Sequence, residues 1–274
     1  MAEDASNHRE GLAWQTGVWD QMSQVYLGEI DKRFAPVVEH VIARATLQTG
    51  ERVLDLGTGT GAVAVQAARR VGPGGQVVGL DISPEMLVLA ERRVTELALT
   101  NVRLREGRAE AIPADDESFD VLLASLCFMY VIDRSAAARE CARVLRPGGR
   151  FVASVWGPPE ECDIVRFQQT AGRFAPPPPV PGVGPGALAD PAPFLEELAE
   201  AGIQAHVETE VVVFDFPDFA SAWQILAGVT TAQLPREQQE QSKAAVLAAM
   251  WSEGDGRREF RNLTQFFVGE RSGE

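Results

Sequence analysis

The feature that most constrains this chain is an apolar segment that runs directly into a glycine-rich turn. Residues 53–61 read Val-Leu-Asp-Leu-Gly-Thr-Gly-Thr-Gly, and a second apolar segment, residues 77–81, ends in Asp81. Glycines let a backbone turn tightly and approach a ligand closely, and a carboxylate that ends the next strand can accept hydrogen bonds from both hydroxyls of a ribose. The two segments together predict one half of a nucleoside-binding crevice.

The glycine spacing argues against a dinucleotide as the ligand. Dinucleotide folds use Gly-x-Gly-x-x-Gly, which seats a pyrophosphate at a helix amino terminus. Here the spacing is Gly-x-Gly-x-Gly, and Asp55 stands two residues before Gly57. A carboxylate at that place repels a phosphate and attracts a cation. We therefore expect a ligand that combines a nucleoside with a positively charged group, and we do not expect a nicotinamide oxidoreductase.

Strands and helices alternate along the first part of the chain. Apolar residues recur at helical spacing in residues 34–45, 62–71 and 84–97. The second of these helices is expected to stop at Gly72, and the third to begin with Ser83 as its cap followed by a proline. This alternation predicts an α/β fold with a doubly wound, mostly parallel sheet. Later helices are expected at residues 193–201, 219–227 and 236–250, and later strands at residues 203–216 and 260–269.

We expect residues 1–274 to form a single domain, because a chain of this length with 45% hydrophobic residues can bury one core and a smaller cap. The core is predicted at residues 34–157, 191–216 and 259–270, and the cap at residues 10–30, 158–190 and 217–254. The proline-rich residues 176–186 fit neither a helix nor a central strand. Either a disordered linker or an ordered loop near the substrate agrees with them, and we favour the ordered loop.

Charge and cysteine content exclude several classes of function. A net charge of −14 disfavours nucleic acid as a partner, since such binding depends on clustered Lys and Arg. The spacing of Cys127, Cys141 and Cys162 is too wide for a cysteine metal knuckle, so we expect reduced thiols and no metal. The longest apolar run, residues 121–132, is too short to cross a bilayer, and residues 1–10 lack the apolar centre of a secretory signal. We predict a cytoplasmic protein without a membrane partner, and a homo-oligomer is left open.

Three further blocks follow the glycine turn, at residues 101–113, 118–126 and 143–152. In this order the blocks resemble the class I S-adenosylmethionine-dependent methyltransferases, and they are most similar to the small-molecule branch with quinone-biosynthesis and natural-product enzymes. The resemblance is good from Val53 to Trp156 and loose elsewhere. It implies a Rossmann-like methyltransferase fold with seven strands, the seventh antiparallel and placed between the fifth and the sixth. The implied cofactor is S-adenosyl-L-methionine, with S-adenosyl-L-homocysteine as its product.

The resemblance also implies the residues that bind the cofactor. Asp55 is expected to hold the ammonium of the methionine part, directly or through water, and Asp81 to bind the ribose, with helix capping as its alternative role. Relatives usually place an aspartate before Ala109, but this chain has Arg108, which only donates hydrogen bonds. Adenine must then be recognised by the backbone of Ala109, by Glu110, or by another group. The predicted cofactor-binding residues are Asp55, Gly57, Thr58, Gly59, Gly61, Asp81, Ile82, Met86, Arg108, Ala109, Glu110, Ser125 and Leu126.

Methyl transfer from a sulfonium is an in-line displacement that needs little acid–base help. Alignment of the reactants can lower the activation free energy by roughly 7–11 kcal/mol. A positioned base raises the rate by about 10²- to 10⁴-fold, which corresponds to only a few kcal/mol. Relatives often have histidines where Met129 and Tyr130 stand, and the three histidines of this chain are expected in solvent. We therefore select Tyr130 as an orienting group or base. The predicted substrate-contacting residues are Trp14, Trp19, Tyr26, Tyr130, Trp156, Phe174 and Trp223, although aromatic residues at helical spacing also suit core packing.

Two functions therefore remain open at this point. The first is methyl transfer from S-adenosylmethionine to oxygen, nitrogen or carbon of a small, largely apolar metabolite. The second is a non-methylating protein that binds the same cofactor, either a regulator or a natural-product cyclase. Arg108 and the missing histidine pair favour the second, whereas Asp55, the glycine turn and Asp81 fit both.

Overall fold

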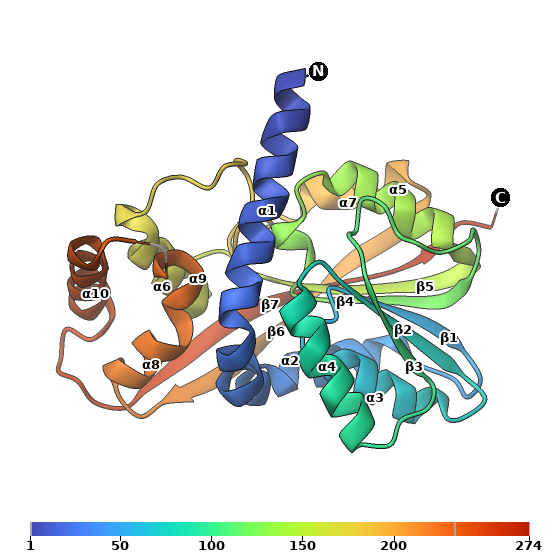
Figure 1. Cartoon of the computed structure of the whole chain (residues 1–274), viewed down its shortest axis with the longest axis horizontal. Coiled ribbons are helices and arrows are strands. Elements are labelled where there is room, and N and C mark those ends of the chain that lie inside the picture. The colour runs from blue at the N-terminus through green and yellow to red at the C-terminus, as the bar shows by residue number, and fades with distance from the viewer. Residues whose placement is uncertain (1, 233, 274) are drawn as a thin grey trace.

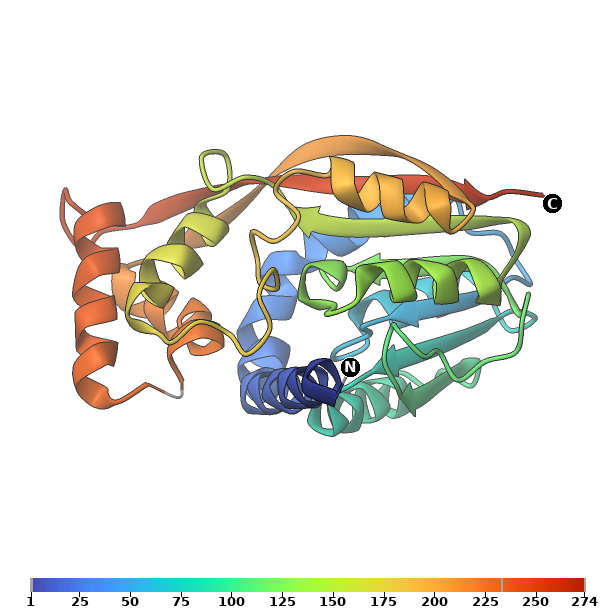
Figure 2. The same ribbon diagram turned by 90° about the horizontal axis from the view of Figure 1, so that it is seen from above.

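The computed structural model describes residues 2–232 and 234–273, with side chains from residue 10 onward. Its centre is one seven-stranded sheet with the order β3-β2-β1-β4-β5-β7-β6 (Figures 1 and 2). The first five strands pair in parallel, and β7 is antiparallel to both β5 and β6. The predicted α/β sheet with an inserted antiparallel seventh strand is confirmed. The strands are β1 (Arg52–Leu56), β2 (Gln76–Asp81), β3 (Val102–Glu106), β4 (Phe119–Ser125), β5 (Leu145–Trp156), β6 (Ile203–Phe216) and β7 (Arg258–Arg271).

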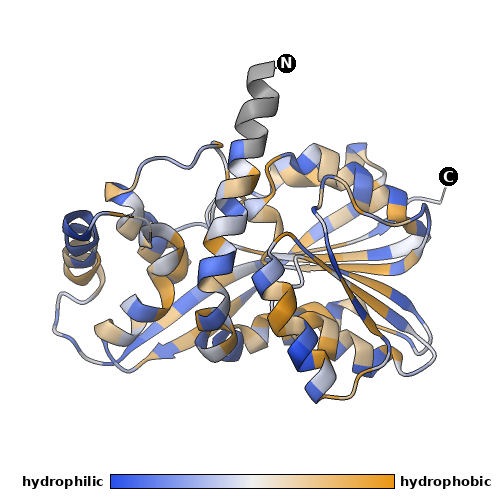
Figure 3. Ribbon diagram, in the orientation of Figure 1, coloured by the Kyte–Doolittle hydropathy of each residue, from blue (hydrophilic) through white to orange (hydrophobic). Residues whose placement is uncertain are grey.

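Helices cover both faces of the sheet, as a doubly wound fold requires. The helices α2 (Asp31–Ala45), α3 (Ala62–Val71) and α4 (Pro84–Glu96) lie on one side, and α5 (Arg134–Val144) and α7 (Ala192–Glu200) lie on the other (Figure 1). Each buries an apolar face against the strands, and hydrophobic residues gather along the central strands (Figure 3). For α2 the buried residues are those that the helical spacing predicts, namely Val37, Val38, Val41, Ile42 and Ala45.

Local signals set the ends of these helices. Ser83 caps α4, because its Oγ accepts a hydrogen bond from the Met86 N–H at 3.1 Å. Gly72 ends α3 with φ of +69°, a conformation that suits glycine. Gly61, just before α3, has φ of +82°, and a Cβ there would lie 3.2 Å from Ala90 of α4. Gly61 therefore serves the turn and the packing of α3 on α4.

A second group of helices lies beyond one end of the parallel strands, against the long β6 and β7 (Figure 1). It comprises α6 (Asp163–Ala171), α8 (Phe219–Leu226), α9 (Gly228–Thr231) and α10 (Arg236–Met250), with a 3₁₀ turn at Gly172–Phe174. The sequence analysis expects α8 and α10 but not α6. Nine residues contain too few helical periods to stand out between two proline-rich stretches, and α6 is stabilised by burying Ile164, Val165 and Phe167.

The chain reaches the sheet through one continuous helical path. α1 (Ala2–Val25) crosses between the two groups of helices, and a π-helical turn, Tyr26–Ile30, joins it to α2 (Figure 1). The proline-rich loop beside it is ordered, as expected, because the Gly184 N–H donates to Met129 O at 2.8 Å and Arg134 donates to Gly182 O at 3.1 Å. In the described part of the chain, no helix has the length and apolar character needed to cross a membrane.

Candidate cofactor and substrate site

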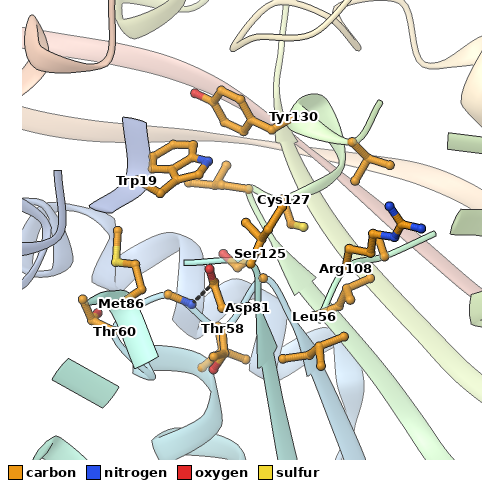
Figure 4. Close-up of a pocket in the computed structure, with 18 of the residues that line it drawn as sticks. Trp19, Leu56, Thr58, Thr60, Asp81, Met86, Arg108, Ser125, Cys127 and Tyr130 are labelled. Carbon is orange, nitrogen blue, oxygen red and sulfur yellow. Dashed lines mark hydrogen bonds between the residues drawn. The ribbon is translucent and has the colours of Figure 1, made fainter. Parts of the chain in front are cut away.

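A cavity of about 140 Å³ lies at the carboxyl ends of β1, β2 and β4, which is where parallel sheets open into crevices (Figure 4). The glycine turn, the strand ends and α1 form its walls. Of the predicted residues, those at the cavity are Trp19, Tyr26, Gly57, Thr58, Gly59, Asp81, Ile82, Met86, Arg108, Ala109, Glu110, Ser125, Leu126 and Tyr130.

Two glycines of the turn have different roles. A Cβ on Gly57 would lie 2.6 Å from the Sγ of Cys127, so packing against the loop after β4 requires glycine there. A Cβ on Gly59 would meet no atom within 4 Å, and this glycine lines the cavity with φ of +54°. The missing side chain at Gly59 therefore leaves space that a ligand can occupy, whereas the missing side chain at Gly57 makes space for Cys127.

Asp81 connects the glycine turn to the end of β2. Its Oδ2 accepts a hydrogen bond from the Gly59 N–H at 2.7 Å, and its Oδ1 accepts one from the Ser83 N–H at 2.9 Å. Burial raises the pKa of this carboxyl, although the backbone hydrogen bonds oppose that effect. Each carboxylate oxygen can accept more than one hydrogen bond, so Asp81 can shape the turn and still bind ribose hydroxyls.

Asp55 lies beneath the turn instead of at the cavity. Its side chain has no exposed surface, and its Oδ2 accepts a hydrogen bond from the Thr58 hydroxyl at 2.6 Å. Burial raises the pKa of Asp55 to about 7 against the opposing hydrogen bonds of Thr58 and the Ala64 backbone. Neither Asp55 nor Gly61 lines the cavity. Asp55 therefore lies behind the cavity wall, where the predicted contact through water is still open to it, and Gly61 has the packing role described above.

Residues that line the cavity lie on both sides of Asp81. Thr60 and Arg108 lie on opposite sides of Asp81 in the close-up view (Figure 4). Next to Arg108, the Oε1 of Glu110 accepts hydrogen bonds from the backbone N–H groups of Ile132 and Asp133, at 3.3 and 3.4 Å. A nucleoside with its ribose at Asp81 can therefore extend toward Thr60 on one side of the cavity and toward Arg108 on the other.

A smaller cavity of about 40 Å³ adjoins the first on the side of the second helix group. We call it the apolar chamber, and the residues that line both cavities are Trp19, Tyr26, Phe34, Leu126 and Tyr130. Trp19 meets Tyr130 edge to face, with ring centroids 4.8 Å apart and an angle of 89° between the rings. Trp156 also lines the chamber, as the substrate prediction requires.

The apolar chamber contains hydrogen-bond donors but no charged side chain among the described residues that line it. Its one amide, on Gln168, donates to Leu226 O at 2.6 Å and accepts from the Thr230 hydroxyl at 3.1 Å. Burial raises the pKa of both Tyr26 and Tyr130 above the usual range, so both phenols keep their protons near neutral pH. The chamber can therefore orient a polar group without removing a proton from it.

Some predicted substrate residues are not brought to either cavity. Trp14 is partly buried on α1, and Phe174 is exposed. Trp223 packs against Phe167 and Phe219, each with ring centroids 6.1 Å apart. Trp14 and Trp223 thus agree with the alternative of core packing, whereas the exposed Phe174 agrees with neither core packing nor a place at the cavities.

The cavity also contains residues that the sequence analysis did not select. Thr60 lies inside the glycine motif, so its position was a usable signal. Asp31 and Phe34 lie at the first turn of α2, and Cys127 follows β4. No spacing in the sequence marks Asp31 and Phe34, because the π-helical turn that joins α1 to α2 brings them to the cavity, whereas Cys127 directly follows the predicted residues Ser125 and Leu126.

Comparisons with known proteins agree with this geometry. A profile described as a methyltransferase domain matches residues 47–169. A ubiquinone/menaquinone biosynthesis C-methyltransferase of Marinomonas sp. is 32% identical over 196 residues, which are 71% of this chain and 74% of that protein. The chain belongs to the S-adenosylmethionine-dependent methyltransferase family. Its resemblance to small-molecule members is confirmed by a second relative, the nocamycin O-methyltransferase of Saccharothrix syringae, 40% identical over 136 residues.

The similarity of this chain to several relatives is partial in length. The match to the nocamycin enzyme covers 49% of this chain and 48% of that protein, so the chain spans about half the length of such relatives. Among solved structures, the YcgJ protein of Bacillus subtilis superposes with a TM-score of 0.64 at 20% identity, covering 86% of this chain and 98% of that one. At that identity the comparison shows a shared fold.

The residues at the cavity have the chemistry that an adenosyl sulfonium cofactor requires. The open space at Gly59 accommodates a ligand close to the backbone, and the Asp81 carboxylate stands at the end of β2. In residues 2–232 and 234–273 no group of three or more His, Cys, Asp and Glu side chains suited to a metal ion is found. His40 instead contacts Arg44, and His206 pairs with Glu208 in solvent.

Proposed function

We propose that this protein transfers a methyl group from S-adenosylmethionine to oxygen, nitrogen or carbon of a small, largely apolar metabolite by in-line displacement. The observation that supports it best is the apolar chamber, which adjoins the cofactor cavity across a shared wall of aromatic residues and Leu126. A substrate in the chamber can approach a methyl group in the cavity from that wall. Family membership and the small-molecule relatives agree with this arrangement.

In the proposed complex the ribose lies at Asp81, the adenine lies toward Ala109 and Glu110, and the sulfonium lies toward Ser125 and Leu126. An acceptor lone pair attacks the methyl carbon as the carbon–sulfur bond breaks, and the bonding electrons stay on sulfur to yield S-adenosylhomocysteine. Holding the two reactants in line can lower the activation free energy by roughly 7–11 kcal/mol. Alignment by the two cavities is therefore the main catalytic contribution.

Tyr130 acts in this proposal as an orienting group. Its phenol keeps its proton at neutral pH, because burial raises its pKa, so it can donate a hydrogen bond but does not take up a proton. The acceptor must then reach the chamber already ionised or with a free lone pair. A small-molecule partner also agrees with a net charge of −14, which disfavours nucleic acid.

Two measurements test the proposal. Calorimetry with S-adenosylmethionine, S-adenosylhomocysteine and NAD should show binding of the adenosyl amino acids and none of NAD. Incubation with trideuteromethyl-labelled cofactor and a panel of apolar phenols, enols and amines should then give labelled products with an equal amount of S-adenosylhomocysteine. Binding of NAD in place of the adenosyl compounds would contradict the proposal.

A non-methylating protein is the second candidate, and the absence of charged side chains among the described chamber residues favours it. Such a chamber offers nothing to accept a proton from a neutral acceptor. If the cofactor binds and stays intact while an apolar polyene or ketone is rearranged, the cyclase alternative holds. Formation of S-adenosylhomocysteine separates the two functions, because only methyl transfer consumes the sulfonium.

A further inference from the structure

Asp31 is an acidic residue at the cofactor cavity that no motif assigns. It is the first residue of α2, it lines the cavity, and its side chain is only 10% exposed. Its Oδ2 accepts a hydrogen bond from the Thr60 hydroxyl at 2.7 Å and a second one from the guanidinium of Arg93. Thr60 and Arg93 also bond to each other, at 3.3 Å. The carboxylate is thus held from one side, and no described residue donates a hydrogen bond to its Oδ1.

The position of Asp31 matches one end of the proposed cofactor. A nucleoside with its ribose at Asp81 extends toward Thr60 on one side and toward Arg108 on the other (Figure 4). Each end holds one carboxylate and one guanidinium, but they differ in hydrogen bonding: Glu110 Oε1 already accepts two backbone N–H groups, whereas Asp31 accepts its two hydrogen bonds at Oδ2 and keeps Oδ1 available. The amino-acid end of the cofactor is therefore favoured at the Thr60 end of the cavity, and adenine at the Arg108 end.

Asp55, the ammonium partner expected from the motif, is less well placed. It has no exposed surface, it does not line the cavity, and its Oδ2 is occupied by Thr58 within the turn. A contact between Asp55 and an ammonium group in the cavity therefore requires an intervening water or a movement of the glycine turn. Asp31 requires neither, since it is itself a lining residue of the cavity.

We propose that Asp31 Oδ1 accepts a hydrogen bond from the α-ammonium group of bound S-adenosylmethionine, with Thr60 and Arg93 positioning the carboxylate. This assignment rests on the proposed function, because it requires an adenosyl amino acid as the cofactor. The competing explanation is that Asp31 only pairs with Arg93 and stabilises the start of α2. The two explanations predict different effects of an Asp31 substitution: a contact with the ammonium group affects only ligands that have an amino group, whereas a structural role affects all ligands alike.

The test is calorimetry with S-adenosylhomocysteine and with its desamino analogue, in which hydrogen replaces the amino group. For Asp31→Asn we expect the affinity for S-adenosylhomocysteine to fall roughly 10- to 100-fold, as for a hydrogen bond between charged groups, while the affinity for the desamino analogue changes less than about 2-fold. Asp55→Asn should leave the ratio of the two affinities unchanged. Thr60→Val removes one hydrogen bond to the Asp31 carboxylate and should reduce the ratio of the affinity for S-adenosylhomocysteine to that for the desamino analogue by a few-fold. This variant replaces Asp31→Asn in the test if Asp31→Asn does not fold.

Each other outcome has a definite meaning. An equal loss for both ligands in Asp31→Asn assigns a purely structural role to Asp31, and unchanged affinity for S-adenosylhomocysteine removes it from the ammonium site. A selective loss in Asp55→Asn instead restores the assignment that the motif suggests. If the wild-type protein binds neither S-adenosylmethionine nor S-adenosylhomocysteine, the proposed function itself fails and this assignment fails with it.

Discussion

The hydroxyl of Ser83 donates a hydrogen bond to Asp20 Oδ1 at 2.5 Å, which joins α1 to the turn that follows Asp81. The same Asp20 oxygen accepts the Glu85 N–H at 3.4 Å. Because α1 contributes Trp19 to the cofactor cavity, this contact keeps the helix over the cavity at the turn that holds the predicted ribose ligand.

Asp20→Ala should therefore loosen α1 and speed the release of cofactor. We expect the dissociation rate of S-adenosylhomocysteine to rise about 3- to 10-fold in stopped-flow measurements, because the loss of one hydrogen bond costs about 0.5–1.5 kcal/mol net. Thr16→Ala is the matched control, since the Thr16 hydroxyl bonds only to Leu12 O within α1. Equal rates in both variants would show that the contact does not hold the helix.

Gly59→Arg should abolish cofactor binding and retain the fold. A side chain on Gly59 enters open space in the cavity, and a long one fills the volume that a ligand needs. Gly50→Arg is the control, because Gly50 also has positive φ and open space around its Cβ position but lies in an exposed turn before β1. Calorimetry should show binding in the control alone. Full affinity in Gly59→Arg would disprove the role of this glycine.

Asp81→Ala should weaken the binding of S-adenosylhomocysteine by roughly 1–3 kcal/mol, since it removes a carboxylate that can accept hydrogen bonds from ribose hydroxyls. Because Asp81 also accepts from the Gly59 and Ser83 N–H groups, part of this loss comes from the turn. A 2′-deoxy analogue separates the loss due to the ribose contact from the loss due to the turn. Asp81→Ala should reduce the affinity for this analogue less than the affinity for S-adenosylhomocysteine. An unchanged dissociation constant would remove Asp81 from the site.

Asp55→Asn should increase stability at neutral pH. Asp55 in the unfolded chain ionises near its usual pKa of 3.8, whereas burial raises the folded pKa to about 7. Between these values only the folded state keeps the proton, so the free energy of unfolding falls as pH rises and the loss is complete above pH 7. Denaturant titrations should show the variant gaining about 2–4 kcal/mol over the wild type between pH 4 and pH 8. A constant difference across this range would contradict the raised pKa.

Tyr130→Phe should lower the methyl-transfer rate by only about 3- to 30-fold and leave the shape of the pH–rate profile unchanged. The phenol is expected to orient the acceptor and not to take its proton, because burial raises its pKa. A base would contribute about 10²- to 10⁴-fold, so a loss of that size together with a vanished ionisation in the profile would identify Tyr130 as a base. Initial rates from pH 6 to pH 9 provide this comparison.

Helices and strands with strong local signals could be predicted from the sequence with accurate bounds. The ranges expected for α3, α10 and β6 are those of the structure. In α3 the glycines on both sides stop the helix by their backbone conformation, and in β6 a long run of β-branched and apolar residues has no competing helical period. The short helix α6 escaped prediction because its stability comes from buried neighbours distant in sequence.

The amino-acid sequence by itself determined the nucleoside crevice, because the glycines and Asp81 act within one turn and its neighbouring strand. Only the tertiary structure decided which carboxylates line the cavity: Asp55 belongs to the motif yet lies beneath the turn, whereas Asp31 lies far from it in sequence and reaches the cavity. The physical reason is that backbone conformation follows from neighbouring residues, while the exposure of a side chain depends on which distant segments pack over it.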